Sequence, residues 1–517
     1  MSSQPSTNSG NADGQGGGIP IDVKQLGLVA AIASLSYVFW VVGVMEMIER
    51  LAYYGVKAVA TLYAKDPVSK GGLGVTMNEF GSILSTWALV QCLLPVITGG
   101  LSDRFGYKQT IGISTVVKIF GYLIMASFPT YWGFFAGSIV LASGTAIFKP
   151  GIQGTLVKAT RADNSSMAWG IFYQTVNIGG FMGPLVAGYM RKMEWRYVFL
   201  SCAAIISLNF LMLLTYQEPG KDERLAKAAA AKASGEKQSN LLADSLHELA
   251  KPHVWTYLLV FSAFWFMFNS LFDVLPAHIE EWVDTRDVVL ALFGGKPPTS
   301  EVIKFFVVMS KDGSEILPEG MLNFNSMLIM TTCFLFAGWS GQMKALHSMI
   351  LGTLLASVSL VASGASSLGI ISFAAIGIFS VGEMLSSPKF SEYIGNFAPA
   401  DKKAMYLGFS QIPLAIGWTL EGKFGPMLYD HYASKDVFSR ELLLQKGMAA
   451  TQVAGINQGE AFDTLVNFLK LPAHDVTAQL YATHNVGMVW YIMAVVGVIG
   501  ALGIWMYGRF VASLAKR

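Results

Sequence analysis

The chain has 517 residues, of which 53% are hydrophobic and only 14% are charged. Soluble proteins carry about 25% charged residues, so a chain of this length has too little polar surface for a soluble fold. Lys and Arg number 36 against 34 Asp and Glu, a formal net charge of +2 that provides no basic surface for nucleic acid. The composition therefore predicts a membrane protein and excludes a soluble enzyme or a nucleic-acid-binding protein.

The sequence offers no metal or catalytic motif. Its cysteines, Cys92, Cys202 and Cys333, lie far apart in apolar segments without a CxxC pair, and its seven histidines show no HExxH spacing. We therefore expect no disulfide framework, no metal and no cofactor, and we do not expect an enzyme. Residues 1–27 begin with a Ser-, Gly- and Asn-rich stretch and contain no apolar signal-peptide core, which indicates a disordered N-terminal tail.

Apolar segments follow one another along the chain with short polar breaks between them. At about 20 residues per membrane crossing, twelve of these segments are long enough to span a membrane as helices. They lie near residues 28–63, 79–101, 109–128, 131–158, 167–190 and 195–216, and then near 253–283, 321–340, 346–364, 367–394, 403–427 and 484–510.

The twelve spans fall into two groups of six, separated by a charged stretch. Two pseudo-symmetric halves of this kind are typical of a transporter, so we expect an all-α membrane protein with a central cavity between the halves. The expected segments are a bundle at 28–216, a cytoplasmic linker at 217–252, a bundle at 253–510 with external loops near 284–320 and 428–483, and a C-terminal tail at 511–517.

Lysine and arginine are unevenly distributed among the breaks between spans. The breaks after the even-numbered spans are mostly basic and the break at 129–130 is uncharged, whereas the break after the fifth span, with Arg191, Lys192 and Arg196, is an exception. Because basic loops stay in the cytoplasm, we expect both termini inside, at a bacterial inner or plasma membrane. The residues that carry this prediction are Arg104, Lys108, Lys158, Arg161, Lys344, Lys402, Lys403, Arg509, Lys516 and Arg517.

The first span carries a row of polar side chains that should not face lipid. Ionisable groups at the membrane centre cost about 2.5–3.5 kcal/mol each and usually mark a pathway or an internal pair. Two interpretations stay open: the row lines a wet cavity in which protonation of a glutamate loosens Arg50, or it is a fixed ladder of ion pairs that anchors the span. The spacing places on one helical face Glu46, Glu49, Arg50, Tyr53, Tyr54 and Lys57.

The break between the second and third spans reads GGLSDRFGYK at residues 99–108. This segment resembles the loop motif of the major facilitator superfamily, with Tyr107 where arginine is more usual. The resemblance implies that superfamily's fold of two six-helix halves. It also implies a gating role for Asp103 and Arg104, which would latch one face of a transporter.

Residues 46–55 read EMIERLAYYG and resemble the ExxERFxYYG signature of the proton-dependent oligopeptide transporter family, with Leu51 in place of Phe. Shorter matches follow in the same order as in that family. They are FKP at 148–150, FYQTVN at 172–177, NFN at 323–325, GEMLSSP at 382–388 and Trp418. The matches extend from the first to the eleventh expected span, and the chain resembles a divergent member of the family.

The resemblance implies a site for a zwitterionic peptide, with an acid and a base on opposite walls. Other roles stay open for some residues, since Lys149 would also reach the cytoplasmic edge and an asparagine also serves helix packing. The implied substrate-binding residues are Glu383 for the ammonium group, Lys149 and Lys57 for the carboxylate, Asn177 and Asn325 for the peptide backbone, and Tyr53, Tyr54 and Trp418 for aromatic walls.

The span at 253–283 departs from the family pattern. The expected proton-coupling acid falls at Phe268 or Asn269, and Asp273, one turn later, is the candidate replacement. The expected proton-coupling set is Glu46, Glu49, Arg50 and Asp273. Four further charges within spans receive no role: Lys118, Lys389, Glu421 and Lys423.

The sequence thus predicts a secondary active transporter that carries di- or tripeptides, or related amino-acid-like solutes, together with protons by alternating access. Two alternatives stay open: transport of another small solute such as nitrate, a nucleoside or a drug, and a receptor or assembly subunit that keeps the fold without transport. We expect a peptide-like small molecule and the lipid bilayer as partners, and the long external loops leave a protein partner open.

Overall fold

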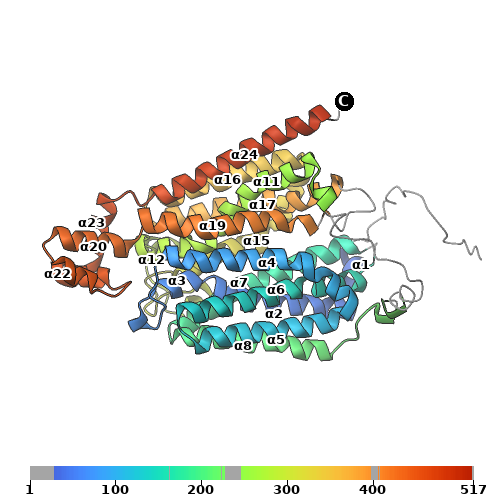
Figure 1. Ribbon diagram of the computed structural model, residues 1–517, viewed down its shortest axis with the longest axis horizontal. Coiled ribbons are helices and arrows are strands. Elements are labelled where there is room, and N and C mark those ends of the chain that lie inside the picture. Colours follow the sequence, from blue (N-terminus) through green and yellow to red (C-terminus); the bar gives the residue numbers. More distant parts are fainter. Residues whose placement is uncertain are drawn as a thin grey trace, which may run out of the picture.

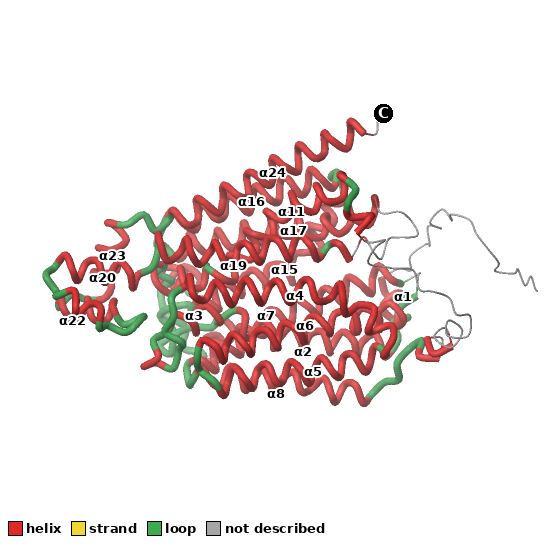
Figure 2. Tube along the Cα trace, viewed as in Figure 1, coloured by secondary structure: helices red, strands yellow, loops and turns green. Residues whose placement is uncertain are grey.

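The computed structural model describes residues 28–161, 164–222, 224–226, 246–397, 406 and 408–514. Every named element in these residues is a helix, and twelve of these helices have 20 residues or more. The long helices lie side by side along the longest axis of the molecule (Figure 1, Figure 2). The predicted all-α membrane fold is therefore confirmed.

The long helices follow the predicted spans in order, with shorter helices between them. The first half contains α1 (Leu28–Ala33), α2 (Tyr37–Lys57), α3 (Ala60–Lys65), α4 (Met77–Phe105), α5 (Tyr107–Ser127), α6 (Tyr131–Ala159), α7 (Ser165–Arg191) and α8 (Trp195–Leu214). The second half contains α11 (Pro252–Asp273), α12 (Leu275–Trp282), α13 (Arg286–Leu292), α14 (Glu301–Val307), α15 (Pro318–Gly341), α16 (Ala345–Ala365), α17 (Gly369–Phe397), α19 (Gln411–Tyr432), α20 (Lys435–Gln445), α21 (Ala450–Ala454), α22 (Ala461–Leu469), α23 (Ala473–Thr483) and α24 (Met488–Leu514).

Two predicted spans break into separate helices. The span at 28–63 divides into α1, α2 and α3, and Ser36 caps α2 by accepting a hydrogen bond from the backbone N–H of Phe39 at 3.3 Å. The span at 253–283 divides at Val274, and Pro276 lies in the first turn of α12, where a missing N–H costs no helical hydrogen bond. Local caps and turns, rather than a loss of hydrophobicity, set these boundaries.

Two pairs of long helices join the halves: α4 packs against α19, and α7 packs against α15. Glycines bring α4 and α19 into backbone contact. A Cβ atom on Gly81 would lie 2.8 Å from the carbonyl oxygen of Gly422, and one on Gly422 would lie 2.8 Å from the nitrogen of Ser85. Ser85 Oγ also donates a hydrogen bond to the carbonyl of Thr419 at 2.9 Å. Small residues at such a crossing let two membrane helices approach closely.

Seven helices in the described part of the chain are long and apolar enough to cross a membrane by length and composition alone. The long helices outside this set are α2, α4, α7, α15 and α19. Four of these five form the contact between the halves, and the fifth, α2, carries the charged row. The protein is an integral membrane protein.

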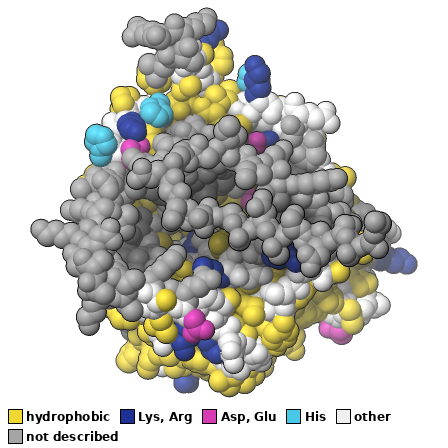
Figure 3. Space-filling view, turned by 90° about the vertical axis from the view of Figure 1, so that its right-hand side faces the viewer, with side chains coloured by type: hydrophobic (Ala, Val, Ile, Leu, Met, Phe, Trp, Pro, Cys, Tyr) yellow, Lys and Arg dark blue, Asp and Glu magenta, His cyan; other side chains and the backbone are white. Residues whose placement is uncertain are grey.

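Both ends of the described chain lie at the same end of the helix bundle (Figure 1). Helices α3, α12 and α20 to α23 lie at the opposite end, which we call the loop end. Figure 3 looks onto the end with the chain termini, where lysine and arginine side chains, in dark blue, lie at several points of the visible surface. Among the described residues, the loop end therefore carries an additional layer of short helices.

Candidate functional site

The acidic end of the charged row points into the first half. Arg50 bonds to Glu46 at 2.9 Å (Nε to Oε1) and to Glu49 at 2.8 Å (Nη2 to Oε2). Lys118 on α5 reaches Glu49 at 3.6 Å (Nζ to Oε1), and its Nζ lies 3.8 Å from the ring centre of Phe148. All four charged side chains are buried. We call Glu46, Glu49, Arg50 and Lys118 the charge ladder; its two acids and two bases balance each other.

The other end of the row faces the second half. Lys57 Nζ lies 2.5 Å from Asp273 Oδ1 on α11, and Thr61 Oγ1 donates to the backbone carbonyl of Asp273 at 2.8 Å. The ring of Tyr54 lies 5.8 Å from that of Phe272. Lys57, predicted to hold a substrate carboxylate, is thus engaged by Asp273 in this structure. The charged row of α2 therefore contributes to two sites: the charge ladder inside the first half, and a contact between the two halves.

Asp273 belongs to a buried cluster that joins three helices. The Nδ2 atom of Asn269 lies 2.5 Å from Asp273 Oδ2 and 2.7 Å from Glu421 Oε2 on α19. Asp273 and Glu421 are fully buried. We call Lys57, Asn269, Asp273 and Glu421 the cross-half cluster. The sequence singled out Glu421 only by its depth within a span, because the contacts that give it a context come from other helices.

A second buried acid, Glu383 on α17, lies in the second half. Asn325 on α15 donates from Nδ2 to Glu383 Oε2 at 3.0 Å and to Ser380 Oγ at 3.0 Å. The carboxyl group of Glu383 also lies within electrostatic range of Tyr54 and Tyr173 of the first half. No ion pair joins Glu383 to another residue of the described chain, and the amide of Asn325 donates a hydrogen bond to its carboxyl group.

Two of the remaining predicted substrate residues lie near the charge ladder: the guanidinium carbon of Arg50 is 5.5 Å from the ring centre of Tyr53, and Lys149 is within electrostatic range of Glu46 and Glu49. Lys149 on α6 is half-buried, and within the described residues it forms no ion pair. Asn177 on α7 donates to the backbone carbonyl of Tyr173 one turn earlier at 2.9 Å. Trp418 on α19 stacks on Phe268 with ring centres 6.3 Å apart. Tyr53 is buried with its ring 6.1 Å from that of Trp87.

Polar contacts between the halves gather at the loop end. Lys65 Nζ lies 2.5 Å from Glu281 Oε1, Lys70 Nζ lies 3.1 Å from Asp463 Oδ2, and Arg191 pairs with Glu319. In the described part of the chain, every ion pair that joins the halves lies toward this end. In this structure, ion pairs therefore hold the two halves together at the loop end.

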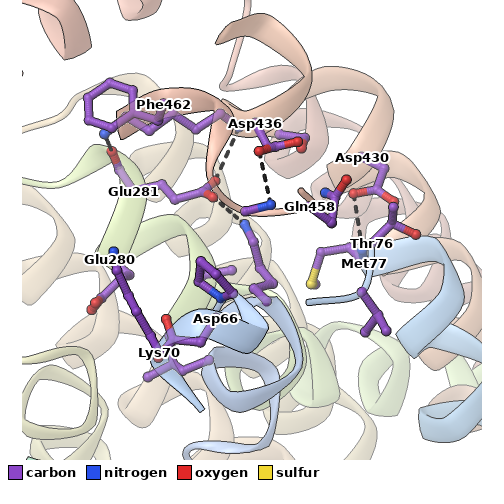
Figure 4. A pocket seen from close by; sticks show the side chains of 18 of the residues that line it. Asp66, Lys70, Thr76, Met77, Glu280, Glu281, Asp430, Asp436, Gln458 and Phe462 are labelled. Atoms are coloured by element: carbon purple, nitrogen blue, oxygen red, sulfur yellow. Dashed lines mark hydrogen bonds and ion pairs between the residues drawn. The ribbon is translucent and has the colours of Figure 1, made fainter. Parts of the chain in front are cut away.

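A polar cavity of about 250 Å³ lies among these contacts (Figure 4). Asp66, Lys70 and Thr76 of the first half face Asp436 and Phe462 of the second across it. Lys435 also lines this cavity and donates to the backbone carbonyl of Glu281 at 2.7 Å. Burial lowers the pKa of Lys435 to about 8. The cavity is small, and the pairs that close it belong to both halves.

The segment assigned to gating lies only partly within the described structure. The side chains of Asp103 and Arg104 lie outside the described residues, while the backbone forms the last turn of α4. Gly106, with a φ of 107°, separates α4 from α5. Lys108 donates from its backbone N–H to Glu218 Oε2 at 3.3 Å and from Nζ to the carbonyl of Tyr216 at 2.7 Å. This turn therefore contacts the chain that follows α8.

Comparison with known proteins places the chain among membrane transporters. A model described as Major Facilitator Superfamily matches residues 26–420. The peptide transporter YePEPT of Yersinia enterocolitica is 28% identical over 162 residues, 30% of this chain and 31% of that protein, and the uncharacterized transporter YclF of Bacillus subtilis is 26% identical over 163 residues, 31% and 33%. The chain thus matches about a third of the length of these two relatives. The multidrug resistance protein MdtH of Yersinia pestis is 22% identical over 363 residues, 69% of this chain and 79% of that protein.

Solved structures show the same architecture over nearly the whole chain. A crystal structure of peptide transporter POT in complex with sulfate aligns with a TM-score of 0.64 at 16% identity, covering 94% of this chain and 97% of that one. A POT family transporter in complex with 5-aminolevulinic acid aligns with a TM-score of 0.63 at 14% identity, covering 91% and 95%. At these identities the similarity establishes the shared fold.

Proposed function

Because the chain belongs to the major facilitator superfamily and is a membrane transporter, we propose that it carries a small zwitterionic solute, a di- or tripeptide or a related amino-acid-like molecule. The two halves would move by alternating access around a site between them. YePEPT and the first POT structure are named peptide transporters, and the second POT structure holds 5-aminolevulinic acid; these names support this substrate class. We propose that transport requires no cofactor and that protons serve as the coupling ion.

The observation that carries the proposal is a pair of charges without counter-ions. The charge ladder balances itself, whereas Lys149 in the first half and Glu383 in the second form no ion pair in the described chain. An interior charge without a partner is costly. A zwitterion would supply both partners at once, with its ammonium group at Glu383 and its carboxylate at Lys149, and would favour closure of the halves around it.

The test is uptake of radiolabelled dialanine into proteoliposomes under an imposed proton gradient. Glu383→Gln and Lys149→Gln should each lower the affinity for dialanine by at least tenfold, since each removes one charged contact of about 1.5–3 kcal/mol. Glu441→Gln, an exposed acid on α20, is the matched control. If both site variants bind dialanine with the affinity of the wild type, Glu383 and Lys149 do not form the zwitterion site.

We propose that protons are the coupling ion and that the charge ladder senses them. Both glutamates hold Arg50, so a proton on either one weakens its hold on the guanidinium. Glu46→Gln and Glu49→Gln should reduce accumulation driven by the proton gradient while leaving exchange of dialanine intact. If both variants accumulate dialanine as the wild type does, the ladder only anchors α2.

A second candidate substrate is a flat aromatic solute such as a cationic drug. Trp418, Phe268 and Trp265 form a group of aromatic rings, and MdtH matches over a larger share of the chain than the peptide transporter does. Thermal-shift measurements with dipeptides and with aromatic cations separate the two candidates, because only the true substrate class stabilises the purified protein.

We also propose that both chain termini are cytoplasmic, so that the loop end is the outer end. The basic breaks of the sequence support this orientation. Labelling of a single cysteine introduced at Asn467, an exposed position of α22, by an impermeant maleimide on intact cells tests it. Labelling only after the cells are opened would reverse the orientation.

A further inference from the structure

We propose that Glu421 and Asp273 form a proton-binding carboxyl pair opposed by Lys57, and that this pair must hold one proton for the outer end of the transporter to close. The proposal rests on the alternating access and the orientation put forward above. It gives a role to Glu421, which the sequence left without one.

The geometry holds the two carboxyl groups together. Asn269 donates from one nitrogen to both of them, at 2.5 Å and 2.7 Å, so the two acceptor oxygens are no more than about 5 Å apart. Neither residue is exposed. The second oxygen of Glu421, Oε1, has no hydrogen-bond partner in the described chain. This oxygen packs against Gly425, where an added Cβ atom would lie 2.4 Å from it. The same Cβ atom would lie 3.1 Å from the side chains of Met493 and Val274, so the surroundings are apolar.

The charges of the cross-half cluster balance only with an added proton. Asp273 and Lys57 are the charged groups that interact with Glu421. Beside this turn of α19, α4 presents Leu84 and α24 presents Met493, neither of which titrates. Two carboxylates against one ammonium leave a net negative charge in a dry interior, where an uncompensated charge is costly. One proton shared by the pair makes the closed cluster neutral.

Opening the outer end changes this balance. When α2 and α11 separate, Lys57 leaves Asp273, water reaches both carboxyl groups, and the shared proton equilibrates with the outer solution. Closing then requires that one proton return before Lys57 can dock. Because one proton is bound on closing, the ratio of closed to open molecules falls by up to about tenfold for each pH unit of increase.

The experiment measures the opening directly and needs no substrate. Spin labels at Val68, on the outer loop of the first half, and Asn467, on α22, report the distance between the halves in the full-length chain with its three cysteines replaced by alanine. The pair Lys70–Asp463 ties the same two segments, so a closed outer end gives a short distance. In the wild type we expect the short-distance population to fall as pH rises from about 5 to 9.

Charge-changing variants give different slopes. Glu421→Gln and Asp273→Asn each leave one acid against Lys57, so the outer end of both variants should close at every pH. If Glu421→Gln fails to fold, Asp273→Asn still provides the test. Lys57→Gln leaves two acids without a cation and needs two protons, so its closed-to-open ratio should fall by up to about a hundredfold per pH unit. Glu441→Gln should follow the wild type. A flat wild-type profile, or a Glu421→Gln profile with the wild-type slope, overturns the proposal.

Counterflow of dialanine in the same pH range separates this proposal from the proposed function. If counterflow is absent but the distances follow the predicted slopes, the substrate assignment fails and the carboxyl pair stands. If counterflow occurs but the distances do not respond to pH, the pair fails and peptide transport stands.

Discussion

Replacing Lys118 by methionine should destabilise the protein by about 3 kcal/mol. Lys118 is fully buried, and its Nζ lies 3.6 Å from Glu49. At an effective dielectric constant of about 20, that separation corresponds to an attraction of about 4–5 kcal/mol. The ring of Phe148 adds about 2 kcal/mol for a desolvated cation, and the cost of burying the ammonium offsets part of the sum. Breaking one side of a buried pair typically costs about 3–5 kcal/mol. Glu49 keeps Arg50 as a partner, which favours the lower end.

The measurement is equilibrium unfolding of the purified protein in mixed micelles by increasing fractions of sodium dodecyl sulfate. Lys118→Met together with Glu49→Gln should recover much of the loss, because the double variant removes the excess negative charge as well as the base. Lys423→Met, at an exposed lysine of α19, is the control and should change the free energy of unfolding by less than about 0.5 kcal/mol. The reasoning is refuted if Lys118→Met unfolds like the control, or if the double variant is no more stable than the single one.

Three further changes test other parts of the structure. Because burial lowers the pKa of Lys435 to about 8, the unfolded chain binds more protons than the folded one between about pH 8 and 10, so the unfolding temperature of the wild type relative to Lys435→Met should rise across that range; a constant difference contradicts this. Gly422→Ala pushes a methyl group against the backbone of α4 and should cost about 1–3 kcal/mol and slow uptake, whereas Gly170→Ala, which meets open space, should do neither. Arg191→Met leaves the buried carboxylate of Glu319 unpaired and should cost about 3–5 kcal/mol in the same unfolding assay; if adding Glu319→Gln recovers none of it, the pair is not the cause.

The sequence predicts the long helices well because the membrane imposes one length and one composition on them. It misplaces breaks that depend on local hydrogen bonds. Nothing in the hydropathy of residues 28–63 marks the break before Ser36, whose side chain caps α2. Similarly, α11 ends at Asp273 although the apolar residues Val274 and Leu275 follow it.

The candidate site is predictable in its residues but not in its pairings. Helical spacing alone places Glu46 and Arg50 one turn apart, and the structure has them in contact. The partner of Lys57 is 216 residues away in the chain, so no local pattern could identify Asp273 as that partner. Glu421 is the clearest case, because its depth in a span marks it as unusual while its partners, Asn269 and Asp273, lie on another helix.

The ion pairs at the loop end differ enough in burial to decide which of them holds it closed. Lys70 and Asp463 are 58% and 59% exposed, and a pair so accessible contributes at most about 1 kcal/mol. Lys57 and Asp273 are 9% and 0% exposed, and separating them without a replacement partner costs about 3–5 kcal/mol. An outer contact of the first kind breaks and reforms by thermal motion alone, whereas the second opens only when water or a proton replaces the lost partner. The buried pairs between the halves, Lys57–Asp273 and Arg191–Glu319, and not the exposed pair Lys70–Asp463, therefore contribute most to the barrier between the two conformations.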